Sequence, residues 1–317
     1  MGHPILAGHR GAAVPDRTRQ THGSKNSSKK SRKPLTFIYM NILEFTSLVW
    51  FGSLIAGFLG SLTGLGGGVV IIPFLTLALG VDIRYAIGAS LVSVIATSSG
   101  AAAAYVKEGF TNIRIGMFLE IATTMGALIG AALALRVSTG IIAVIFGMVL
   151  IYSAYLSSRP KLYRPGDDHP DRLATILRMD GSYPSLNGLI KYHVQAIPGG
   201  FGLMFIAGAL SGLLGIGSGA IKVLAMDQVM RIPFKVSTTT SNFMIGVTAA
   251  ASAGVYLNRG YIDPGVAMPV MLGVLLGSLL GARILAGAKT RILRIIFAVV
   301  IFLLGIEMIY NGLTGRL

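Results

Sequence analysis

Cysteine is absent from this 317-residue sequence, and charged residues make up only 12% of it. Without cysteine the chain can form no disulfide, thiolate metal site, iron–sulfur cluster or cysteine nucleophile. The five histidines all lie outside the long apolar stretches, so the serine of Gly217-Ser218-Gly219 has no histidine base in those stretches. Neither an H-E-x-x-H nor a phosphate-binding P-loop motif occurs. We therefore expect a protein that is not an enzyme and that holds no cofactor or metal.

Apolar residues, in contrast, make up 53% of the sequence, and its mean hydropathy is +0.72. They gather in ten stretches of about 16 to 22 residues, which suit helices that cross a bilayer and are longer than the strands of an outer-membrane barrel. The stretches are 44–62, 64–80, 85–106, 113–135, 138–156, 197–214, 215–230, 236–257, 264–285 and 292–312. We expect an all-α, multi-pass protein of the cell (inner) membrane, with the lipid bilayer as its partner.

Residues 1–39 form a basic arm that carries much of the formal net charge of +15. Eight of its side chains are Lys or Arg and one is Asp, which gives the arm a charge of +7. Its polar composition buries too little apolar surface to fold, so we expect the arm to be disordered. Met40 is an equally good start for the protein, and we expect no nucleic-acid partner.

The chain aligns with itself at an offset of 151 residues, without a gap from residue 57 to residue 150. Chance would pair about two glycines at this offset, given their density in the second half. The glycines that coincide are 57 and 208, 64 and 215, 66 and 217, 68 and 219, 109 and 260, 126 and 277, and 130 and 281. We predict an internal duplication, with a first membrane repeat at 40–156, a cytoplasmic linker at 157–196 and a second membrane repeat at 197–317.

Five apolar segments in each half allow two topologies. If all five cross the bilayer, ten spans result and the repeats are inverted; if 64–80 and 215–230 dip in and return, eight spans remain. Basic residues in short loops favour the cytoplasm. Without the arm and Lys222, the ten-span topology places 14 of 18 Lys and Arg residues inside, and the eight-span topology places 10 there. The count favours ten spans with inverted repeats.

Two glycine clusters interrupt apolar segments at matching places in the two halves. Each glycine costs a helix roughly 1 kcal/mol, so we expect both helices to break there, although close helix packing is an alternative role. Paired breaks in two repeats are typical of a transporter's binding site, and the helix N-termini that follow favour an anion. The residues at the breaks are Gly66, Gly67, Gly68, Gly217, Ser218 and Gly219.

A different pattern marks helix packing. Small residues spaced by four lie on regular apolar segments: Gly126 and Gly130 in the first half, and Gly273, Gly277 and Gly281 in the second. Such a stripe lets two helices approach closely, so we predict that these glycines lie at helix crossings.

The third apolar segment of each half is rich in hydroxyl and amide side chains. Six consecutive polar residues, 237–242, cover all sides of a helix, so some of them must face a polar interior. They can replace part of the hydration of an anion, or they can form hydrogen bonds between helices. The residues that we predict to line the cavity are Ser90, Ser93, Thr240, Ser241 and Asn242.

Charged residues inside apolar segments are rare, so each is a candidate for function. Lys222 follows the second glycine cluster, where it can contact an anion, pair with Asp227 or reach the membrane interface. Glu120, in the fourth segment, is a candidate pairing or proton-carrying group. No proton-coupling residue stands out from the sequence alone.

The sequence resembles the TauE/SafE family of membrane permeases, often called sulfite exporters. The resemblance covers about 44–312 and implies outward transport of sulfite, thiosulfate or an organosulfonate such as sulfoacetate. By motif match, it also implies that the glycine clusters and polar stretches line the cavity. It rests on GFLGSLTGLGGGVVIIPFL at 57–75, AIGASLVSVIATSSGA at 86–101, GALIGAAL at 126–133, and their weaker copies GALSGLLGIGSGAIKV at 208–223 and GSLLGARI at 277–284.

We therefore expect a secondary transporter that exports a small sulfur-containing anion from the cytoplasm by alternating access. The alternatives are an importer or a carrier of another small anion, and an anion channel. A homo-oligomer is compatible with the sequence. The predicted substrate-binding residues are Gly66, Gly67, Gly68, Ser90, Ser93, Gly217, Ser218, Gly219, Lys222, Thr240, Ser241 and Asn242.

Overall fold

The structure is a computed structural model that describes residues 41–63, 67–107, 111–158, 171–185, 188–285 and 290–316. Met40–Leu317 form one compact unit. The predicted basic arm and Gly66 lie outside the described residues, as does part of the predicted linker.

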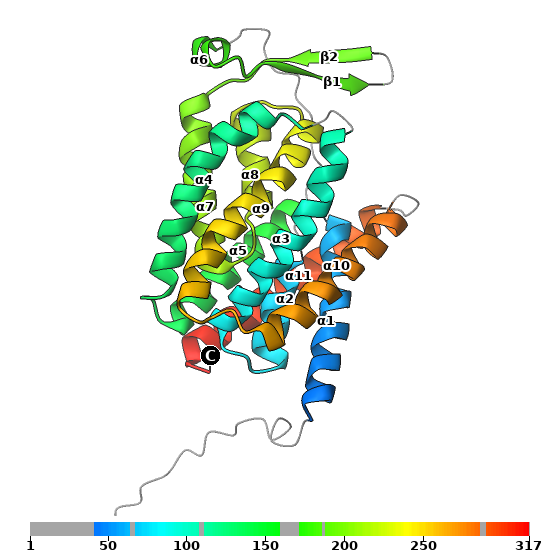
Figure 1. Ribbon diagram of the computed structural model, residues 1–317, viewed down its shortest axis with the longest axis vertical. Coiled ribbons are helices and arrows are strands. Elements are labelled where there is room, and N and C mark those ends of the chain that lie inside the picture. The colour runs from blue at the N-terminus through cyan, green and yellow to red at the C-terminus, as the bar shows by residue number, and fades with distance from the viewer. Residues whose placement is uncertain are drawn as a thin grey trace, which may run out of the picture. The chain divides into compact units, whose positions relative to one another are not determined.

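Most of the described chain is helical (Figure 1). The first set of helices is α1 (Ile42–Thr63), α2 (Gly68–Pro73), η2 (Phe74–Ala78), α3 (Ile83–Lys107), α4 (Ile113–Ala134) and α5 (Thr139–Ser158). The second set is α7 (Ile197–Leu214), α8 (Gly219–Leu224), η3 (Ala225–Val229), α9 (Phe234–Asn258), α10 (Pro264–Leu285) and α11 (Thr290–Thr314). The elements η2 and η3 are π-helical turns that continue α2 and α8.

The predicted helix break is confirmed in the second glycine cluster. Helix α7 ends at Leu214, and the N–H of Gly215 closes it by donating to the carbonyl oxygen of Ser211 at 2.7 Å. Gly215 has a φ of 68°, a backbone conformation that glycine adopts without strain. Helix α8 begins only at Gly219. In the first cluster, α1 ends at Thr63 and α2 begins at Gly68, with 64–66 outside the described residues.

The two sets of helices have matching boundaries. The first and last residues of α8, η3, α9 and α10 lie 151 positions after those of α2, η2, α3 and α4, and α11 begins 151 positions after α5. The offset is the one at which the glycines coincide in the sequence. The boundaries therefore agree even where the side chains of the two halves differ.

Helices α4 and α9 lie side by side and run in the same direction. The N–H of Asn112, the N-cap of α4, donates to Oγ1 of Thr240 at 3.1 Å. Two turns further along both helices, Oγ1 of Thr248 donates to Oε1 of Glu120 at 2.6 Å. Because both contacts advance by eight residues on each helix, α4 and α9 are parallel.

Helices α5 and α11 also pack together, but they run in opposite directions. A Cβ on Gly140 would meet the carbonyl oxygen of Gly312, whereas a Cβ on Gly147 would meet that of Gly305. The contact moves forward along α5 and backward along α11, so the pair is antiparallel.

Glycines form the contacts at two further crossings, between α1 and α10 and between α4 and α7. A Cβ on Gly126 or Gly130 would collide with the backbone of α7, and one on Gly273 or Gly277 would collide with the backbone of α1. The packing role predicted for these four glycines is confirmed. Two helix backbones that approach this closely gain dispersion contacts, and a side chain larger than that of glycine would keep them apart.

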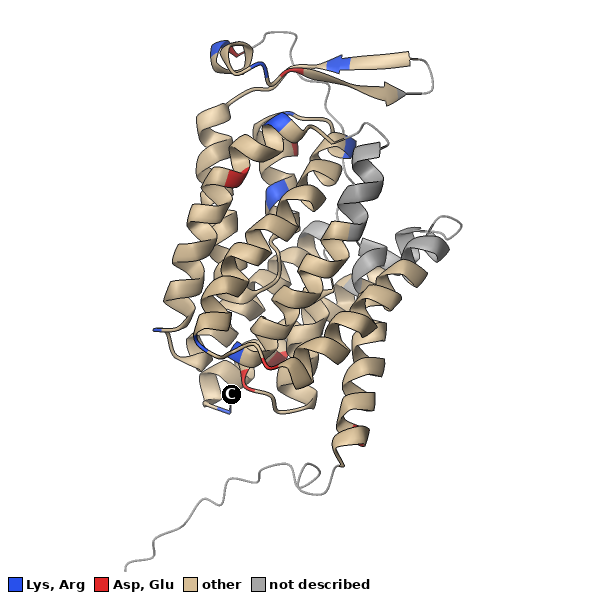
Figure 2. Cartoon of the chain, viewed as in Figure 1, with Lys and Arg blue, Asp and Glu red and all other residues tan. Residues whose placement is uncertain are grey.

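Within the described residues, three helical stretches are long and apolar enough to cross a membrane, judged by length and composition alone: Ile42–Leu59, Ile113–Ala134 and Ile197–Leu214. Five shorter apolar helical stretches accompany them. Apolar side chains such as Phe51, Ile121 and Leu303 are exposed on these helices. Figure 2 shows that charged residues gather near the ends of the helices and on the segment around α6, and are scarce between. This distribution suits a lipid environment.

The predicted linker contains ordered structure. Residues 171–192 form α6 (Arg172–Ile176) and an antiparallel hairpin of β1 (Gly181–Ser185) and β2 (Gly188–Tyr192), at one end of the helices in Figure 1. Among the described residues the fold is therefore mostly helical with one small sheet, and not all-α as the sequence predicts. We call 171–192 the cap.

Alanine at two positions of α7 should separate tight packing from helix propensity. A Cβ on Gly208 would collide with the backbone of Thr123, whereas one on Gly202 meets nothing within 4 Å. We expect Gly208→Ala to lower the free energy of unfolding by about 1 to 3 kcal/mol. Gly202→Ala, the matched control, should be neutral or raise it by up to about 1 kcal/mol. Circular dichroism during thermal unfolding in detergent measures both, and equal stability of the two variants would contradict the crossing.

Candidate functional site

The two glycine clusters meet in the interior of the protein. A Cβ on Gly68, at the start of α2, would lie 3.3 Å from the carbonyl oxygen of Gly215 and would collide with Oγ of Ser90. Oγ of Ser90 donates to that same carbonyl oxygen at 2.8 Å. The predicted residues Gly68 and Ser90 are therefore brought together at the break between α7 and α8, and Ser90 satisfies a carbonyl group that the end of α7 exposes.

The second break is buried and has an unusual backbone. Gly215, Gly217 and Ser218 have φ values of 68°, 73° and 46°, and residues 211–219 are all buried. Ser218 is 3% exposed, and its Oγ has no hydrogen-bond partner among the described residues. A left-handed conformation is rare for a residue other than glycine and is often found at functional sites. An unsatisfied buried hydroxyl at such a place is suited to a polar ligand.

Helix α9 covers the other side of this break. Oγ of Ser241 donates to the carbonyl oxygen of Gly219 at 3.4 Å, and a Cβ on Gly217 or Gly219 would press on Ile245. Glycine is therefore needed at 217 and 219 for the close approach of α9. The structure brings Gly217, Ser218, Gly219 and Ser241 together, and their binding of a substrate stays a prediction.

The remaining polar candidates have other surroundings. Oγ of Ser93 donates to the carbonyl oxygen of Ser90 in its own helix, and Oγ1 of Thr240 accepts the N–H of Asn112 from the start of α4. Asn242 is partly exposed, and Gly67 is the buried N-cap of α2. Ser93 and Thr240 therefore hold the backbone or a neighbouring helix in this structure.

Lys222 belongs to a buried chain of polar groups. The side chain is 0% exposed, and Nζ donates to Oγ1 of Thr248 at 2.5 Å. Thr248 connects in turn to Oε1 of Glu120 at 2.6 Å, and Nζ lies 4.0 Å from Oε2 of Glu120. Glu120 is 8% exposed and receives a further hydrogen bond from Oγ1 of Thr124. We call Lys222, Thr248 and Glu120 the charged triad.

The triad argues against two of the three alternatives that the sequence leaves for Lys222, and its contact with an anion stays a prediction. The lysine is paired with Glu120 of α4, and it does not reach the interface, because it is fully buried. Asp227, the sequence neighbour considered as a partner, accepts a hydrogen bond from Gln228. Thr248 is the member of the triad that the sequence does not single out. The sequence hint for Thr248 is its spacing: it lies two helical turns after Ser241, on the same side of α9.

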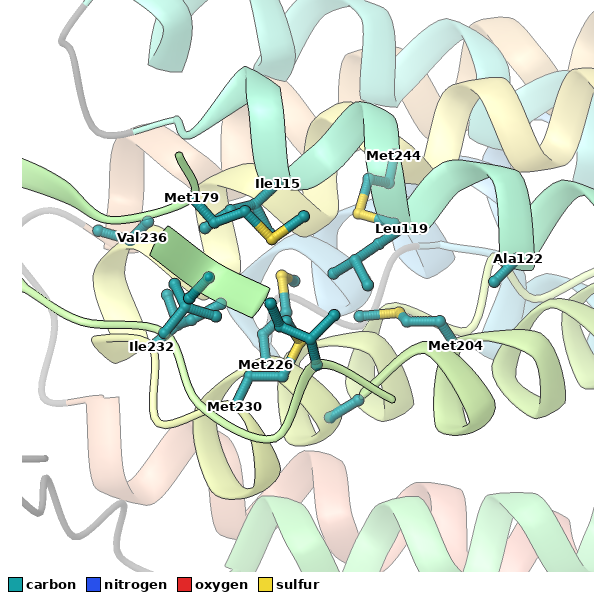
Figure 3. Packing of buried hydrophobic residues seen from close by; sticks show 14 of the residues in the cluster. Ile115, Leu119, Ala122, Met179, Met204, Met226, Met230, Ile232, Val236 and Met244 are labelled. Carbon is teal, nitrogen blue, oxygen red and sulfur yellow. The ribbon is translucent and has the colours of Figure 1, made fainter. Parts of the chain in front are cut away.

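A methionine-rich core (Figure 3) is built in part from α4 and α9, the helices that carry Glu120 and Thr248. Its members come from α4, α7, α9, η3 and the cap, and they include Leu119 and Met244, which flank Glu120 and Thr248 along the chain. Methionine is flexible and fills irregular gaps, so this core can repack when neighbouring helices shift. The buried methionines are Met179, Met204, Met226, Met230 and Met244.

The cap is attached to the start of α4. Nδ2 of Asn112 donates to the hydroxyl of Tyr192 at 2.8 Å and to the carbonyl oxygen of Met179 at 3.3 Å. Burial raises the pKa of Tyr192, the Asn112 hydrogen bond lowers it and Asp180 raises it, with a net increase. A hollow of about 270 Å³ beside these contacts is lined by residues that include Arg114 and Arg178.

Comparison with known proteins identifies the family of this chain. A family model described as "Sulfite exporter TauE/SafE" matches residues 49–308. The probable membrane transporter protein YunE of Bacillus subtilis (strain 168) is 31% identical over 278 residues, 86% of this chain and 99% of that protein. Probable membrane transporter proteins of Xylella fastidiosa (strain 9a5c) and Methanocaldococcus jannaschii are each 25% identical, over 86% and 87% of this chain and 98% of each relative. No solved structure matches.

Removing one charge of the triad should be far more harmful than removing both. Lys222→Met leaves the Glu120 carboxylate buried without its cation, which typically costs about 3 to 5 kcal/mol. We expect this loss in the free energy of unfolding for Lys222→Met, and recovery of most of it when Glu120→Gln is added. Thermal unfolding of the purified variants in detergent measures both, and equal losses would mean that the two charges are not coupled.

Proposed function

The chain belongs to the sulfite exporter TauE/SafE family of membrane transporters, and we propose that it is a secondary transporter that exports a small sulfur-containing anion from the cytoplasm. Sulfite, thiosulfate and organosulfonates such as sulfoacetate are the substrate class. The family and the names of the relatives support a membrane transporter, and the site supports the charge of the solute. Catalysis has no part in this proposal.

The observation that carries the proposal is the buried break at 215–219 with a buried lysine one turn after it. The first N–H groups of a helix have no partner within the helix, and the helix dipole favours negative charge there. The hydroxyl of Ser218 has no partner among the described residues, and the ammonium of Lys222 adds a full positive charge. Amide, hydroxyl and ammonium donors together match the oxygen atoms of sulfite or a sulfonate.

Two inverted repeats in the inner membrane are the second part of the proposal. The matching helix boundaries support a duplication. The helix directions support its inversion: in the ten-span topology α4 and α9 cross the bilayer in the same direction and α5 and α11 in opposite directions, as observed. The eight-span topology requires the reverse for both pairs. Alternating access would then be a movement of a helix bundle around the breaks.

Export needs no further energy source for a multiply charged anion. A membrane potential that is negative inside is worth about 2.3 kcal/mol per charge per 100 mV. A divalent anion is therefore driven outward by about 4.6 kcal/mol at 100 mV, close to three orders of magnitude in concentration. The voltage favours the outward direction for this substrate class.

Flux measurements in proteoliposomes test the substrate class. We expect saturable, voltage-dependent movement of radiolabelled sulfite, thiosulfate or sulfoacetate, and much slower movement of taurine and phosphate. A preference for phosphate or taurine would contradict the substrate class, and discrete unitary currents without saturation in planar bilayers would indicate a channel. Movement of none of these solutes would contradict transport of this kind.

Cysteine labelling tests the inverted topology, because the native chain has no cysteine to mask. In intact cells, a membrane-impermeant maleimide should label Arg259→Cys, between α9 and α10, from outside, and should spare Ser182→Cys in the cap. Ser138→Cys, between α4 and α5, is outside in both topologies and serves as the control. All three positions are exposed. Protection of Arg259→Cys in intact cells would instead indicate eight spans.

A further inference from the structure

Helix packing at this place does not require the charges of the triad. The positions 151 residues from Lys222, Glu120 and Thr248 are Ile71, Met271 and Thr97. Ile71 is fully buried in α2, in the place that Lys222 has in α8. Oγ1 of Thr97 donates to carbonyl groups of its own helix. The three matching positions therefore carry no charge.

A buried ion pair seldom improves stability over apolar residues of the same size, because desolvation offsets the attraction. Ionisable residues inside a membrane are, for the same reason, functional candidates with a named partner. Lys222 and Glu120 are such a pair: both are more than nine-tenths buried and they come from helices of different sets. Such a pair is suited to a function that needs a carboxylate as well as an ammonium.

Charge balance points to that task. The ammonium of Lys222 and the carboxylate of Glu120 together are neutral. An anion that enters the break and contacts Lys222 leaves an excess negative charge in a buried place, which is strongly unfavourable. A proton on Glu120 removes one negative charge and releases Lys222 to the anion.

The hydrogen bonds of Thr248 fit both protonation states of Glu120. Its hydroxyl has two acceptors within reach, Oε1 of Glu120 at 2.6 Å and the carbonyl oxygen of Met244 at 3.0 Å. When Glu120 is ionised, the hydroxyl donates to Oε1. When Glu120 is protonated on Oε2, Oε1 remains an acceptor, so the hydroxyl of Thr248 can still donate to it. The hydroxyl oxygen has two lone pairs, so it can accept from Lys222 in both states.

Oε2 of Glu120 is the atom available for the proton. It is buried and has no hydrogen-bond partner among the described residues, whereas Oε1 receives bonds from Thr248 and Thr124. A carboxylate oxygen that no donor stabilises gains most from protonation once its cation is engaged elsewhere.

We propose that Glu120 is the proton-binding residue of transport: the anion replaces the Glu120 carboxylate as the partner of Lys222, and Glu120 carries one proton while the anion is bound. The proton comes from water on the side where the anion enters and leaves to water on the side where the anion exits. Lys222 stays protonated throughout. This inference rests on the proposed function. For a divalent anion it reduces the net charge moved from two to one, which halves the outward drive that the membrane potential gives to the anion alone.

Other titratable side chains on the elements around the triad are placed differently. Helix α7 has none, and Asp227 of η3 is bonded to Gln228. Tyr256 is buried and donates to the carbonyl oxygen of Gly212. The other titratable side chains that the structure describes on α3, α4 and α9 lie toward the ends of these helices. They are Arg84, Tyr85, Arg114, Lys235 and Arg259. Glu120 is thus the carboxylate placed to respond to an anion at Lys222.

Titration calorimetry with thiosulfate tests the proposal on the purified full-length protein in detergent. Thiosulfate is the probe because it carries no titratable proton near neutrality. Binding heats in buffers of different ionisation enthalpy give the number of protons taken up per anion. We expect about one for the unmodified protein and for Glu120→Asp, and about zero for Glu120→Gln. Glu307→Gln, a substitution of an exposed glutamate on α11, is the matched control and should keep the value of one.

Infrared difference spectra give a second readout that needs no variant. Adding thiosulfate to the unmodified protein should produce the carbonyl band of a protonated carboxylic acid, and Glu120→Asp should shift it. Binding of thiosulfate without proton uptake, or unchanged uptake in Glu120→Gln, would overturn the role of Glu120 and leave the proposed function intact. Absence of both thiosulfate binding and flux of any sulfur anion would overturn the proposed function, and this inference with it.

Discussion

A helix that breaks inside a membrane protein must have its freed backbone groups covered by protein, because the surrounding lipid offers no hydrogen bonds. The rest of this structure depends on that constraint. The hydroxyl of Ser90 satisfies the carbonyl group of Gly215, Gly68 packs close to that carbonyl group, and Ser241 covers the start of α8 from the other side. The same constraint explains why only glycine or a small residue fits at these positions.

The surrounding helices hold the break by backbone contact. At the crossings of α1 with α10 and of α4 with α7, glycines bring the backbones together, so the frame has little freedom to shift without losing many contacts at once. The methionine-rich core is different, since its side chains can repack. A rigid frame around an adaptable core is suited to a site that has to accept and release a solute. The charges of Lys222 and Glu120, one from each set of helices, add polarity to this frame.

Much of the architecture could be predicted from the sequence. The lengths of the apolar stretches and the positions of the glycines are local signals, and aligning the sequence with itself reveals the duplication. The glycine offset of 151 residues is also the offset of the helix boundaries. The partner of Lys222 could not be predicted, since Glu120 is distant in sequence and a lysine side chain can reach in several directions. The ordered structure of the cap could not be predicted, and its sequence indicates only a polar linker. Its few buried side chains, such as Met179 and Tyr192, show no periodic pattern. The hydrogen bonds of Ser93 and Thr240 likewise could not be predicted, because the composition of the segment does not show which partners the folded chain provides.

The central claim is that an anion binds at the break between α7 and α8, next to Lys222. A crystal structure with selenite, the heavier congener of sulfite, tests it most directly, because anomalous scattering from selenium locates the ion. The account predicts a peak within hydrogen-bonding distance of the backbone N–H groups at 217–219 and of Nζ of Lys222. A peak elsewhere, such as between Arg114 and Arg178 beside the cap, with none at the break, would contradict it.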